Sequence, residues 1–319
     1  MSYYVIKRTL YGLVTAFGLV LLVFGLMKLI PGSVVSQLVD QSAGFDQKKL
    51  AEIEAFLGLD RPWYVQFGTW FRDFLMGDMG YSWRSRIAVS QLLGPRLFVT
   101  LELAGLATLI SVIFIGIPNG LLAANYKSKW QDTAVRVFSL AALSVPVFWM
   151  GSMLILIFSV YFKWSPPLTW VSPTDDLWAN ISMMALPAFA LGLAGAAPLV
   201  RMTRNSVLEV KGQNYIRTAR SIGNSEIKIL FNHALPNASI PIITSAGLQF
   251  GFLLGGVVVI EEVFALPGVG RLLLQAISQR DFPVVQACIL TIGLFLIFLN
   301  IFVDILYAYL DPRIRFIKE

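Results

Sequence analysis

Long apolar runs, separated by polar stretches, recur along the whole chain. A helix needs about 20 mostly apolar residues to cross the roughly 30 Å hydrocarbon core of a membrane. Six runs reach that length, so the pattern predicts an all-α integral membrane protein with about six transmembrane helices. The predicted spans are Thr9 to Ile30, Leu101 to Ala124, Val135 to Tyr161, Asn180 to Val200, Ile240 to Ile260 and Val284 to Leu306.

Four prolines fall inside these predicted spans: Pro118, Pro146, Pro187 and Pro198. Proline removes a backbone hydrogen bond, and membrane helices tolerate it where neighbouring helices or side chains satisfy the freed carbonyl group. We therefore expect the spans to pack together as a bundle.

A longer polar region separates the first span from the second. It divides the chain into an N-terminal transmembrane helix (1–30), an extracytoplasmic region (31–99) and a core that holds the other spans (100–319). Residues Asp46 to Leu57 predict a short helix in this region. An aromatic-rich stretch follows, which is typical either of a membrane interface or of a surface that meets a partner. Its members are Trp63, Tyr64, Trp70, Phe71, Phe74, Tyr81 and Trp83.

The composition agrees with a membrane location. Hydrophobic residues make up 56% of the 319 positions, and the mean hydropathy is +0.70, whereas soluble domains contain about 45–50% apolar residues. The formal charge is +6, but the basic residues lie in short loops beside spans, where they orient helices rather than bind nucleic acid. The apolar runs predict a multi-pass membrane protein, and the positive-inside rule predicts that both termini are cytoplasmic.

The first span has an alternative interpretation as a cleaved signal peptide, because Lys7 and Arg8 precede it. Its apolar core is longer than the about 7–15 residues usual in signals, and no small-x-small cleavage site closes it. We therefore interpret it as a retained transmembrane helix.

The chain offers few groups for chemistry of its own. It lacks the Gly-x-x-x-x-Gly-Lys-Ser/Thr motif that cradles nucleotide phosphates, and His233 is its only histidine. We predict no catalytic residue, no bound cofactor and no metal site, and hence no enzyme. Cys288 is expected to be a small packing residue. Lys28, Glu102 and Asp304 lie near span ends, where charged side chains reach the interface at low cost.

The stretch from Arg201 to about Ser239 is long, basic and patterned as helix. Tyr215, Ala219 and Ile222 repeat at i, i+4 and i+7 and predict one apolar stripe. Gly223 is expected to end this helix.

A second short helix is predicted directly afterwards, with Asn224 or Ser225 as its cap and Pro236 as its end. Two short helices at a sharp angle would make a compact lever that passes a push from a soluble partner into two spans. An amphipathic helix lying on the inner leaflet is the alternative.

At this loop the sequence resembles the membrane subunits of binding-protein-dependent ABC importers. Their cytoplasmic loop has the pattern Glu, Ala, Ala, three residues, Gly, nine residues, Ile, one residue, Leu, Pro. With Gly223 aligned on the family glycine, the remaining pattern positions hold Arg217, Thr218, Ala219, His233, Leu235 and Pro236. The departures at Arg217, Thr218 and His233 are similar to those of the peptide, dipeptide and nickel branch of the family.

Three further stretches resemble the same branch: Leu29 to Gly32, Leu57 to Ser82, and Glu262 to Arg271. The resemblance covers essentially the whole chain. It is greatest to the first permease, the one with the larger external loop, of dipeptide or oligopeptide importers. It implies a type I ABC importer permease fold with an extracytoplasmic insertion after the first helix.

The resemblance also implies a location in the inner (plasma) membrane, and it implies partners. A second, homologous permease would form the pathway with this chain, an extracytoplasmic solute-binding protein would deliver di- or oligopeptides, and two cytoplasmic ATPases would bind ATP and Mg²⁺. Those ATPases would drive alternating access through a coupling loop at 201–239. The residues implied in coupling are Tyr215, Ile216, Arg217, Thr218, Ala219, Arg220, Gly223, His233, Leu235 and Pro236.

Other functions stay open at this point. An ion-coupled secondary transporter is one, although such carriers place charged groups nearer the membrane midplane. A non-transporting membrane scaffold is another. Among ABC permeases, nickel chelates, glutathione, sugars or other small solutes are alternatives to peptides.

The fifth span suggests helix packing and a substrate path. Gly247, Gly251 and Gly255 repeat every fourth residue, as in the small-xxx-small motif that lets two helices approach closely. Ser245 and Gln249 lie roughly opposite them. We expect the glycines to pack on a neighbouring helix and the two polar side chains to face the pathway, with bonding to adjacent helices as the alternative.

Overall fold

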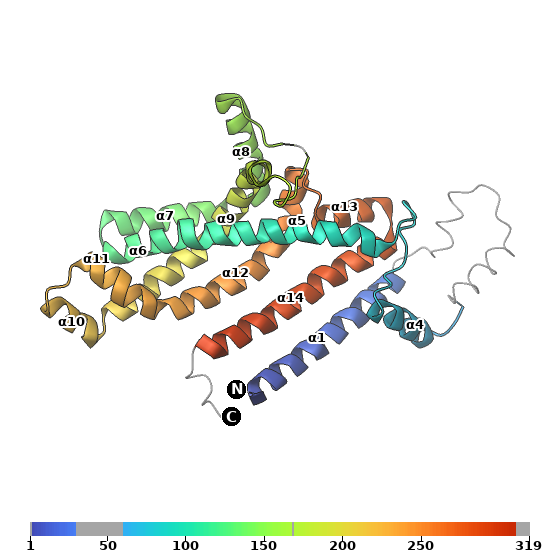
Figure 1. Cartoon of the computed structure of the whole chain (residues 1–319), viewed down its shortest axis with the longest axis horizontal. Coiled ribbons are helices and arrows are strands. Elements are labelled where there is room, and N and C mark those ends of the chain that lie inside the picture. Colours follow the sequence, from blue (N-terminus) through green and yellow to red (C-terminus); the bar gives the residue numbers. More distant parts are fainter. Residues whose placement is uncertain (1, 30–59, 168, 311–319) are drawn as a thin grey trace. The chain divides into compact units, whose positions relative to one another are not determined.

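The computed structural model describes residues 2–29, 60–167 and 169–310, and the regular elements in these ranges are helices (Figure 1). The predicted helix at Asp46 to Leu57 lies outside the described residues. In chain order the elements are α1 (Ser2–Leu29), α4 (Trp63–Leu75), α5 (Val89–Leu109), η1 (Ile110–Gly116), α6 (Ile117–Asn125), α7 (Trp130–Ser144), α8 (Val147–Phe162), α9 (Leu177–Lys211), α10 (Asn214–Ser221), α11 (Glu226–Lys228), η2 (Ile229–Ala234), α12 (Leu235–Val263), α13 (Val269–Gln279) and α14 (Phe282–Leu310), where η marks a π-helix.

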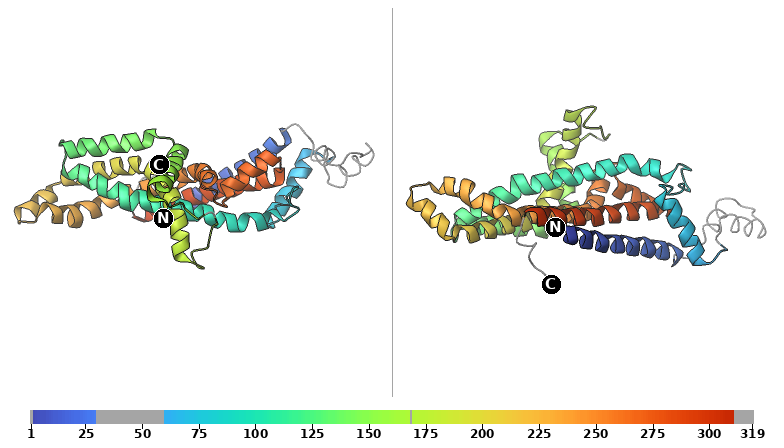
Figure 2. Two further views of the ribbon diagram at one scale, coloured as in Figure 1. Left: turned by 90° about the horizontal axis from the view of Figure 1, so that it is seen from above. Right: turned by 60° about the horizontal axis from the view of Figure 1, so that its bottom comes forward.

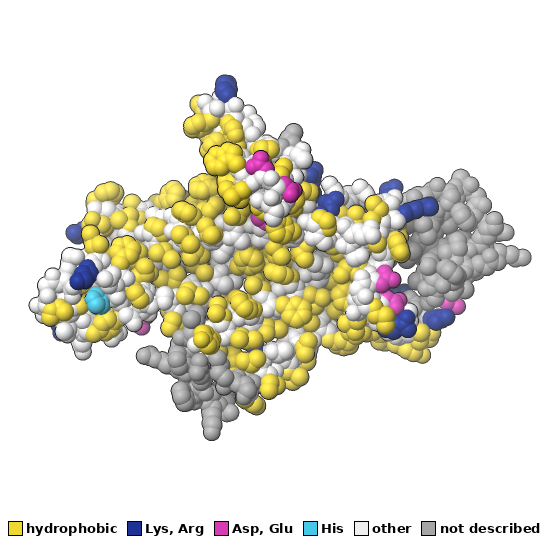
Figure 3. All heavy atoms as spheres, in the orientation of Figure 1, with side chains coloured by type: hydrophobic (Ala, Val, Ile, Leu, Met, Phe, Trp, Pro, Cys, Tyr) yellow, Lys and Arg dark blue, Asp and Glu magenta, His cyan; other side chains and the backbone are white. Residues whose placement is uncertain are grey.

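Five continuous helical stretches are long and apolar enough to cross a membrane: Tyr3–Leu29, Val89–Asn125, Leu177–Lys211, Glu226–Val263 and Phe282–Leu306. The pair α7 and α8 makes a sixth if it is counted as one broken span. Hydrophobic side chains cover much of the face shown in Figure 3, as expected for helices that meet lipid. The predicted all-α membrane fold with about six spans is confirmed.

The third predicted span, Val135 to Tyr161, is wrong as one straight helix. α7 and α8 are bent by 100° at a break between them (Figure 2). Val145 is extended, with φ −84° and ψ 127°, because the ring of the following proline disfavours helical backbone at the preceding residue. Pro146 then forms the N-cap of α8.

Proline has a different effect in the second and fifth spans. Pro118 lies two residues after η1, and Pro236 lies two residues after η2. The hydrogen bonds of a π-helix run from i to i+5, so a wider turn displaces the carbonyl groups that the proline ring would otherwise meet. The helix therefore continues through Pro236 as far as Val263, and the prediction that Pro236 ends the second helix of the loop is wrong.

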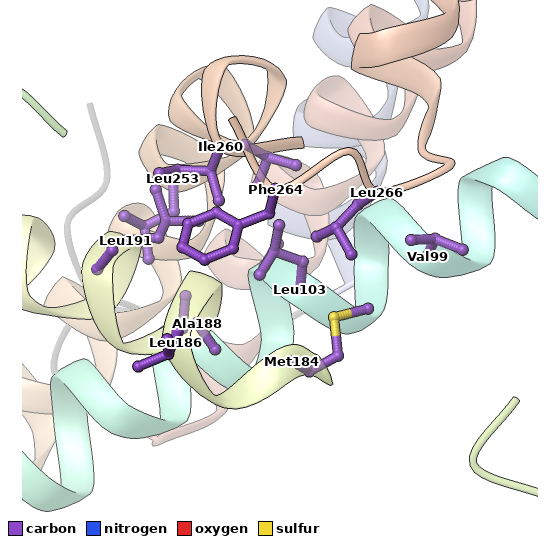
Figure 4. Packing of buried hydrophobic residues seen from close by; sticks show 14 of the residues in the cluster. Val99, Leu103, Met184, Leu186, Ala188, Leu191, Leu253, Ile260, Phe264 and Leu266 are labelled. Carbon is purple, nitrogen blue, oxygen red and sulfur yellow. The ribbon is translucent and has the colours of Figure 1, made fainter. Parts of the chain in front are cut away.

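The chain divides into two compact units. The first combines residues 1–12, 95–272 and 295–319, and α9 contributes the most buried of its membrane-length helices. Side chains of α5, α9 and α12, with the turn after α12, form the main core of this unit (Figure 4). Its members include Val99, Leu103, Met184, Leu191, Leu253, Ile260, Phe264 and Leu266.

The second unit combines residues 13–94 and 273–294. Its buried cluster joins α1 and α14, and aromatic side chains of α4 pack against it. Trp70, Phe71 and Phe74 belong to that packing, and Trp83 contacts Phe282 edge-on. These four aromatic side chains therefore pack within the unit, and the role of the stretch at a membrane interface or partner surface stays a prediction. The others, Trp63, Tyr64 and Tyr81, are exposed.

Candidate functional site

The predicted loop from 201 to 239 is helical over most of its length. α9 continues to Lys211, α10 and α11 follow after short turns, and η2 leads directly into α12. We call residues 212–234 the knob. It lies at the joined ends of α9 and α12 (Figure 1). The knob is the candidate functional site, because it is a polar, ordered element fixed between two membrane-length helices.

A Schellman motif ends α10 at Gly223. The Gly223 amide donates to the Arg220 carbonyl (2.9 Å), and the Asn224 amide donates to the Ala219 carbonyl (3.3 Å). Gly223 has φ +86°, a left-handed conformation that favours glycine because other residues carry a Cβ. Ser225 caps α11 by accepting a hydrogen bond from a backbone amide (3.4 Å). The predicted turn at Gly223 and the predicted cap at Ser225 are confirmed.

A small buried core holds the two halves of the knob together. It consists of Ile216 and Ala219 of α10 and Ile229 of η2. Tyr215 is 44% exposed and Ile222 is 74% exposed, so only Ala219 of the predicted stripe joins this core. Packing across the Gly223 turn selects the side of α10 that carries Ile216, and the local repeat does not report that contact.

Glu226 links α11 to α10 and to the end of α9. Its carboxylate accepts a hydrogen bond from Arg220 Nε (2.6 Å) and lies 3.3 Å from Lys211 Nζ. The hydrogen bond to Glu226 raises the pKa of the Arg220 guanidinium. Exposed ion pairs contribute only about 0–1 kcal/mol each, so this network links α9, α10 and α11 but adds little stability.

Hydrophobic contacts seat the knob on the helices that lead into it. Leu230 and Ala234 of η2 are buried in one cluster with Val207 of α9 and Leu121 of α6. Ala238 and Ile242 extend the same cluster along α12. Because packed interiors transmit displacement, a force on the knob acts on α9 and α12 directly.

The residues implied in coupling occupy two layers of this segment. Ile216 and Ala219 are buried, and His233 and Leu235 are half-buried. The exposed members are Tyr215, Arg217, Thr218, Arg220, Gly223 and Pro236. Sequence analysis missed two hydrophobic side chains on the same segment, Ile227 (70% exposed) and Phe231 (52% exposed). Basic side chains and the single histidine mark the knob in Figure 3.

The glycines of the fifth span differ in their surroundings. A Cβ on Gly247 would lie 2.8 Å from the side chain of Val303 in α14, and one on Gly251 would lie 3.6 Å from Leu296. Among the described residues, no atom lies within 4 Å of a Cβ placed on Gly255. α14 therefore approaches α12 closely at Gly247 and is in ordinary contact with it at Gly251, and the packing role of the three glycines stays a prediction.

Gln249 and Ser245 lie one turn apart on α12 but differ in burial. Gln249 is 6% exposed and faces α9, where a Cβ on Gly195 would collide with its amide. Its Nε2 has no hydrogen-bond partner among the described residues. Ser245 is half-buried and begins an outward row on α12 that continues with Leu248, Phe252, Gly255 and Val259.

Sequence analysis missed three buried carboxylates, Glu261, Asp281 and Asp132 of α7. Glu261 is fully buried and accepts hydrogen bonds from the Thr100 hydroxyl (2.6 Å) and the Arg271 amide (2.9 Å). In the second unit, Asp281 accepts from the Ser82 hydroxyl. The Glu261 and Asp281 sites both involve stretches that carried the family resemblance. Neither of these two sites has a local signal in the sequence, because the hydroxyl groups of Thr100 and Ser82 that donate to the carboxylates come from distant parts of the chain.

The charged side chains near span ends each have a polar partner. Lys28 donates to Gln66, Arg8 pairs with Asp304, and the Trp170 indole donates to Glu102 (3.2 Å). Within the described ranges, no group of three or more His, Cys, Asp or Glu side chains is arranged to hold a metal ion.

The chain belongs to the family of binding-protein-dependent transport system inner membrane components, which matches residues 116–316. The predicted resemblance to ABC importer permeases is confirmed. A putative peptide transport system permease protein of Brucella abortus (strain 2308) is 40% identical over 316 residues, which cover 99% of this chain and all of the relative. The dipeptide transport system permease protein DppB of Escherichia coli (strain K12) is 37% identical over 338 aligned positions, which cover 99% of both chains.

Solved structures support the same fold. Inward facing conformations of the MetNI methionine ABC transporter match with TM-scores of 0.55 and 0.58, at 18% and 16% identity. Each match covers 69% of this chain and 97% of the other chain. The predicted type I ABC importer permease fold is confirmed, and family membership favours an importer over an ion-coupled carrier or a scaffold.

Proposed function

We propose that this protein is a transmembrane permease subunit of an ATP-driven importer of di- or oligopeptides. Relatives that are 34–40% identical along nearly the whole chain carry the names of peptide or dipeptide permeases. The structural observation that carries the coupling role is the knob. It is a packed, cross-braced element that continues without a flexible linker into α9 and α12.

In this proposal the knob receives the motion of an ATPase subunit. Its exposed side chains would fill a groove on that partner. They include one cation and four large apolar groups, which are Arg217 and then Tyr215, Ile222, Ile227 and Phe231. A bound partner shifts a conformational equilibrium only if it holds the knob differently in the two states. The ATPases bind ATP and Mg²⁺, and this chain, which lacks a phosphate-binding motif, contributes no hydrolytic residue.

The substrate path is assigned to the outward row of α12. Ser245, Leu248 and Phe252 leave a largely uncharged surface, which suits peptides of varied sequence. Gln249 faces α9 and would reach the path only after α9 and α12 move apart. A second, homologous permease completes the pathway, and an extracytoplasmic solute-binding protein delivers the peptide. Both termini and the knob lie in the cytoplasm.

Reconstitution tests this proposal. The complex, purified with its second permease, its ATPases and its binding protein, should import labelled di- and oligopeptides into proteoliposomes only with ATP present. Nickel chelates and glutathione serve as competing substrates. Uptake driven by an ion gradient without ATP, or ATP-driven uptake of a competing solute but no peptide, would contradict the proposal.

A change at Gly223 tests the knob specifically. Gly223→Val places a branched side chain in a left-handed conformation, at a cost of about 1–2 kcal/mol, and should distort the α10–α11 turn. We expect more ATP hydrolysed per peptide imported. Gly223→Asn is the matched control, since asparagine tolerates this conformation. Equal coupling ratios in both assembled variants would show that the turn has no role in coupling.

A further inference from the structure

An ion pair links Arg204 to Asp132 of a separate helical hairpin, α6 and α7. Arg204 lies in the last two turns of α9, which we call the base of the knob. Asp132 lies in the first turn of α7, and its side chain is 1% exposed. Arg204 of α9 donates to both carboxylate oxygens, from Nε to Oδ1 (2.8 Å) and from Nη2 to Oδ2 (2.7 Å). The Ser128 amide also donates to Oδ2 (3.1 Å), and Arg136 Nε lies 3.4 Å from Oδ1. Both oxygens of the Asp132 carboxylate therefore have polar partners.

The helices beside this pair are in close contact. Ala123 of α6, Val135 of α7 and Val200 of α9 form a shared buried cluster. A Cβ on Gly120 would lie 2.5 Å from Cβ of Thr203, so the backbone of α6 approaches α9 directly. The hairpin of α6 and α7 thus packs along the last turns of α9, and the ion pair closes the contact on the side of the knob.

We propose that Asp132 and Arg204 form a coupling clasp, a pair of positioning residues that makes the α6–α7 hairpin move as one body with the base of the knob. Motion delivered to the knob would then reach α7 and the bend at Pro146, in addition to α9 and α12. The clasp rests on the proposed function, because it acts on the motion that the ATPases supply.

The geometry favours a mechanical role over simple stabilisation. Replacement of a buried ion pair by apolar residues of similar volume is often neutral or stabilising. A bidentate guanidinium–carboxylate pair, by contrast, fixes the distance and the relative orientation of two helices together. The Arg8–Asp304 pair in the same unit is more exposed, at 42% and 29% of its side chains, and it joins α1 to α14, away from the knob.

Two conservative variants test the clasp in the reconstituted complex. Asp132→Asn keeps the shape of the side chain but removes its negative charge. Arg204→Lys keeps the positive charge but removes the guanidinium group that donates to both carboxylate oxygens. Each should raise the ATP hydrolysed per peptide imported by about fivefold or more, the lower end of typical coupling between sites. Asp304→Asn is the matched control and should leave this ratio unchanged. An unchanged ratio in both clasp variants would overturn the proposal.

A covalent replacement separates a clasp from a merely structural pair. In a Cys288→Ala background, Asp132→Cys with Arg204→Cys should be poorly coupled, and a short thiol cross-linker between the two positions should restore the wild-type ratio. A cross-link that blocks import while ATP hydrolysis continues would mean that the helices must separate, which overturns the clasp. Loss of assembly in every variant, Arg204→Lys included, would also overturn it. Failure of the wild-type complex to import peptide with ATP would refute the proposed function instead.

Discussion

Thr100 and Glu261 show how single polar side chains fix a turn between helices. The first amides of α13 have no partner within that helix. The Val269 amide donates to the Thr100 hydroxyl (2.9 Å), and the Arg271 amide donates to Glu261 (2.9 Å). A Cβ on Gly268 would lie 2.0 Å from the Glu261 carboxylate, so this position requires glycine. The side chains of Thr100 and Glu261 therefore cap the N-terminus of α13, which lies in the Glu262 to Arg271 stretch.

Thr100→Val replaces one hydroxyl group by a methyl group and should lower the free energy of unfolding substantially. It leaves a buried carboxylate oxygen and a buried amide without partners, at about 1–3 kcal/mol for each. Thr108→Val in the same helix is the control, because the Thr108 hydroxyl donates only to the Ala104 carbonyl one turn earlier (2.8 Å). Thermal unfolding of the detergent-solubilised protein measures the difference. Equal melting temperatures would show that the cap contributes nothing.

At the scale of elements, the outcome of each proline depends on the turn around it. Pro118 and Pro236 follow π-helical turns and leave their helices continuous, whereas Pro146 follows an extended residue and separates α7 from α8. The hydropathy pattern alone does not distinguish Pro118 from Pro146, because both lie inside predicted apolar spans and only Pro146 interrupts its helix. Length and composition therefore predicted where helices occur, and local hydrogen bonding decided whether they continue.

Pro146→Ala should straighten the bend between α7 and α8. The substitution restores a backbone amide and lifts the restriction on Val145. Spin labels at Leu140→Cys and Tyr161→Cys, in a Cys288→Ala background, report the change by pulsed electron paramagnetic resonance. Their separation should lengthen toward the about 32 Å of a continuous helix. Pro95→Ala, inside the uninterrupted α5, is the control and should leave the distance unchanged. No lengthening in Pro146→Ala would mean that tertiary contacts impose the bend.

At the scale of the whole molecule, apolar run length was sufficient to predict the class, because lipid allows few alternatives to helices. The knob was predicted in outline from Gly223 and from the family pattern. Its buried face was not, since Ile216 is selected by Ile229 across the turn. The Asp132–Arg204 pair was missed for the same reason: its partners lie on different helices, and neither residue stands out in the local pattern.

Orientation is the property of the whole molecule on which the proposed function most depends, and it rests on the distribution of Lys and Arg. Two exposed serines provide a matched test, Ser85 before the second span and Ser221 on the knob. In right-side-out membrane vesicles that contain the Cys288→Ala protein, Ser85→Cys should react with a membrane-impermeant maleimide, and Ser221→Cys should react only after the vesicles are permeabilised. The charge bias acts on the loops nearest the spans and predicts that the knob faces the cytoplasm. The reverse labelling would put the knob outside the cell, where no ATPase could drive it, and both the coupling role and the clasp would then fail.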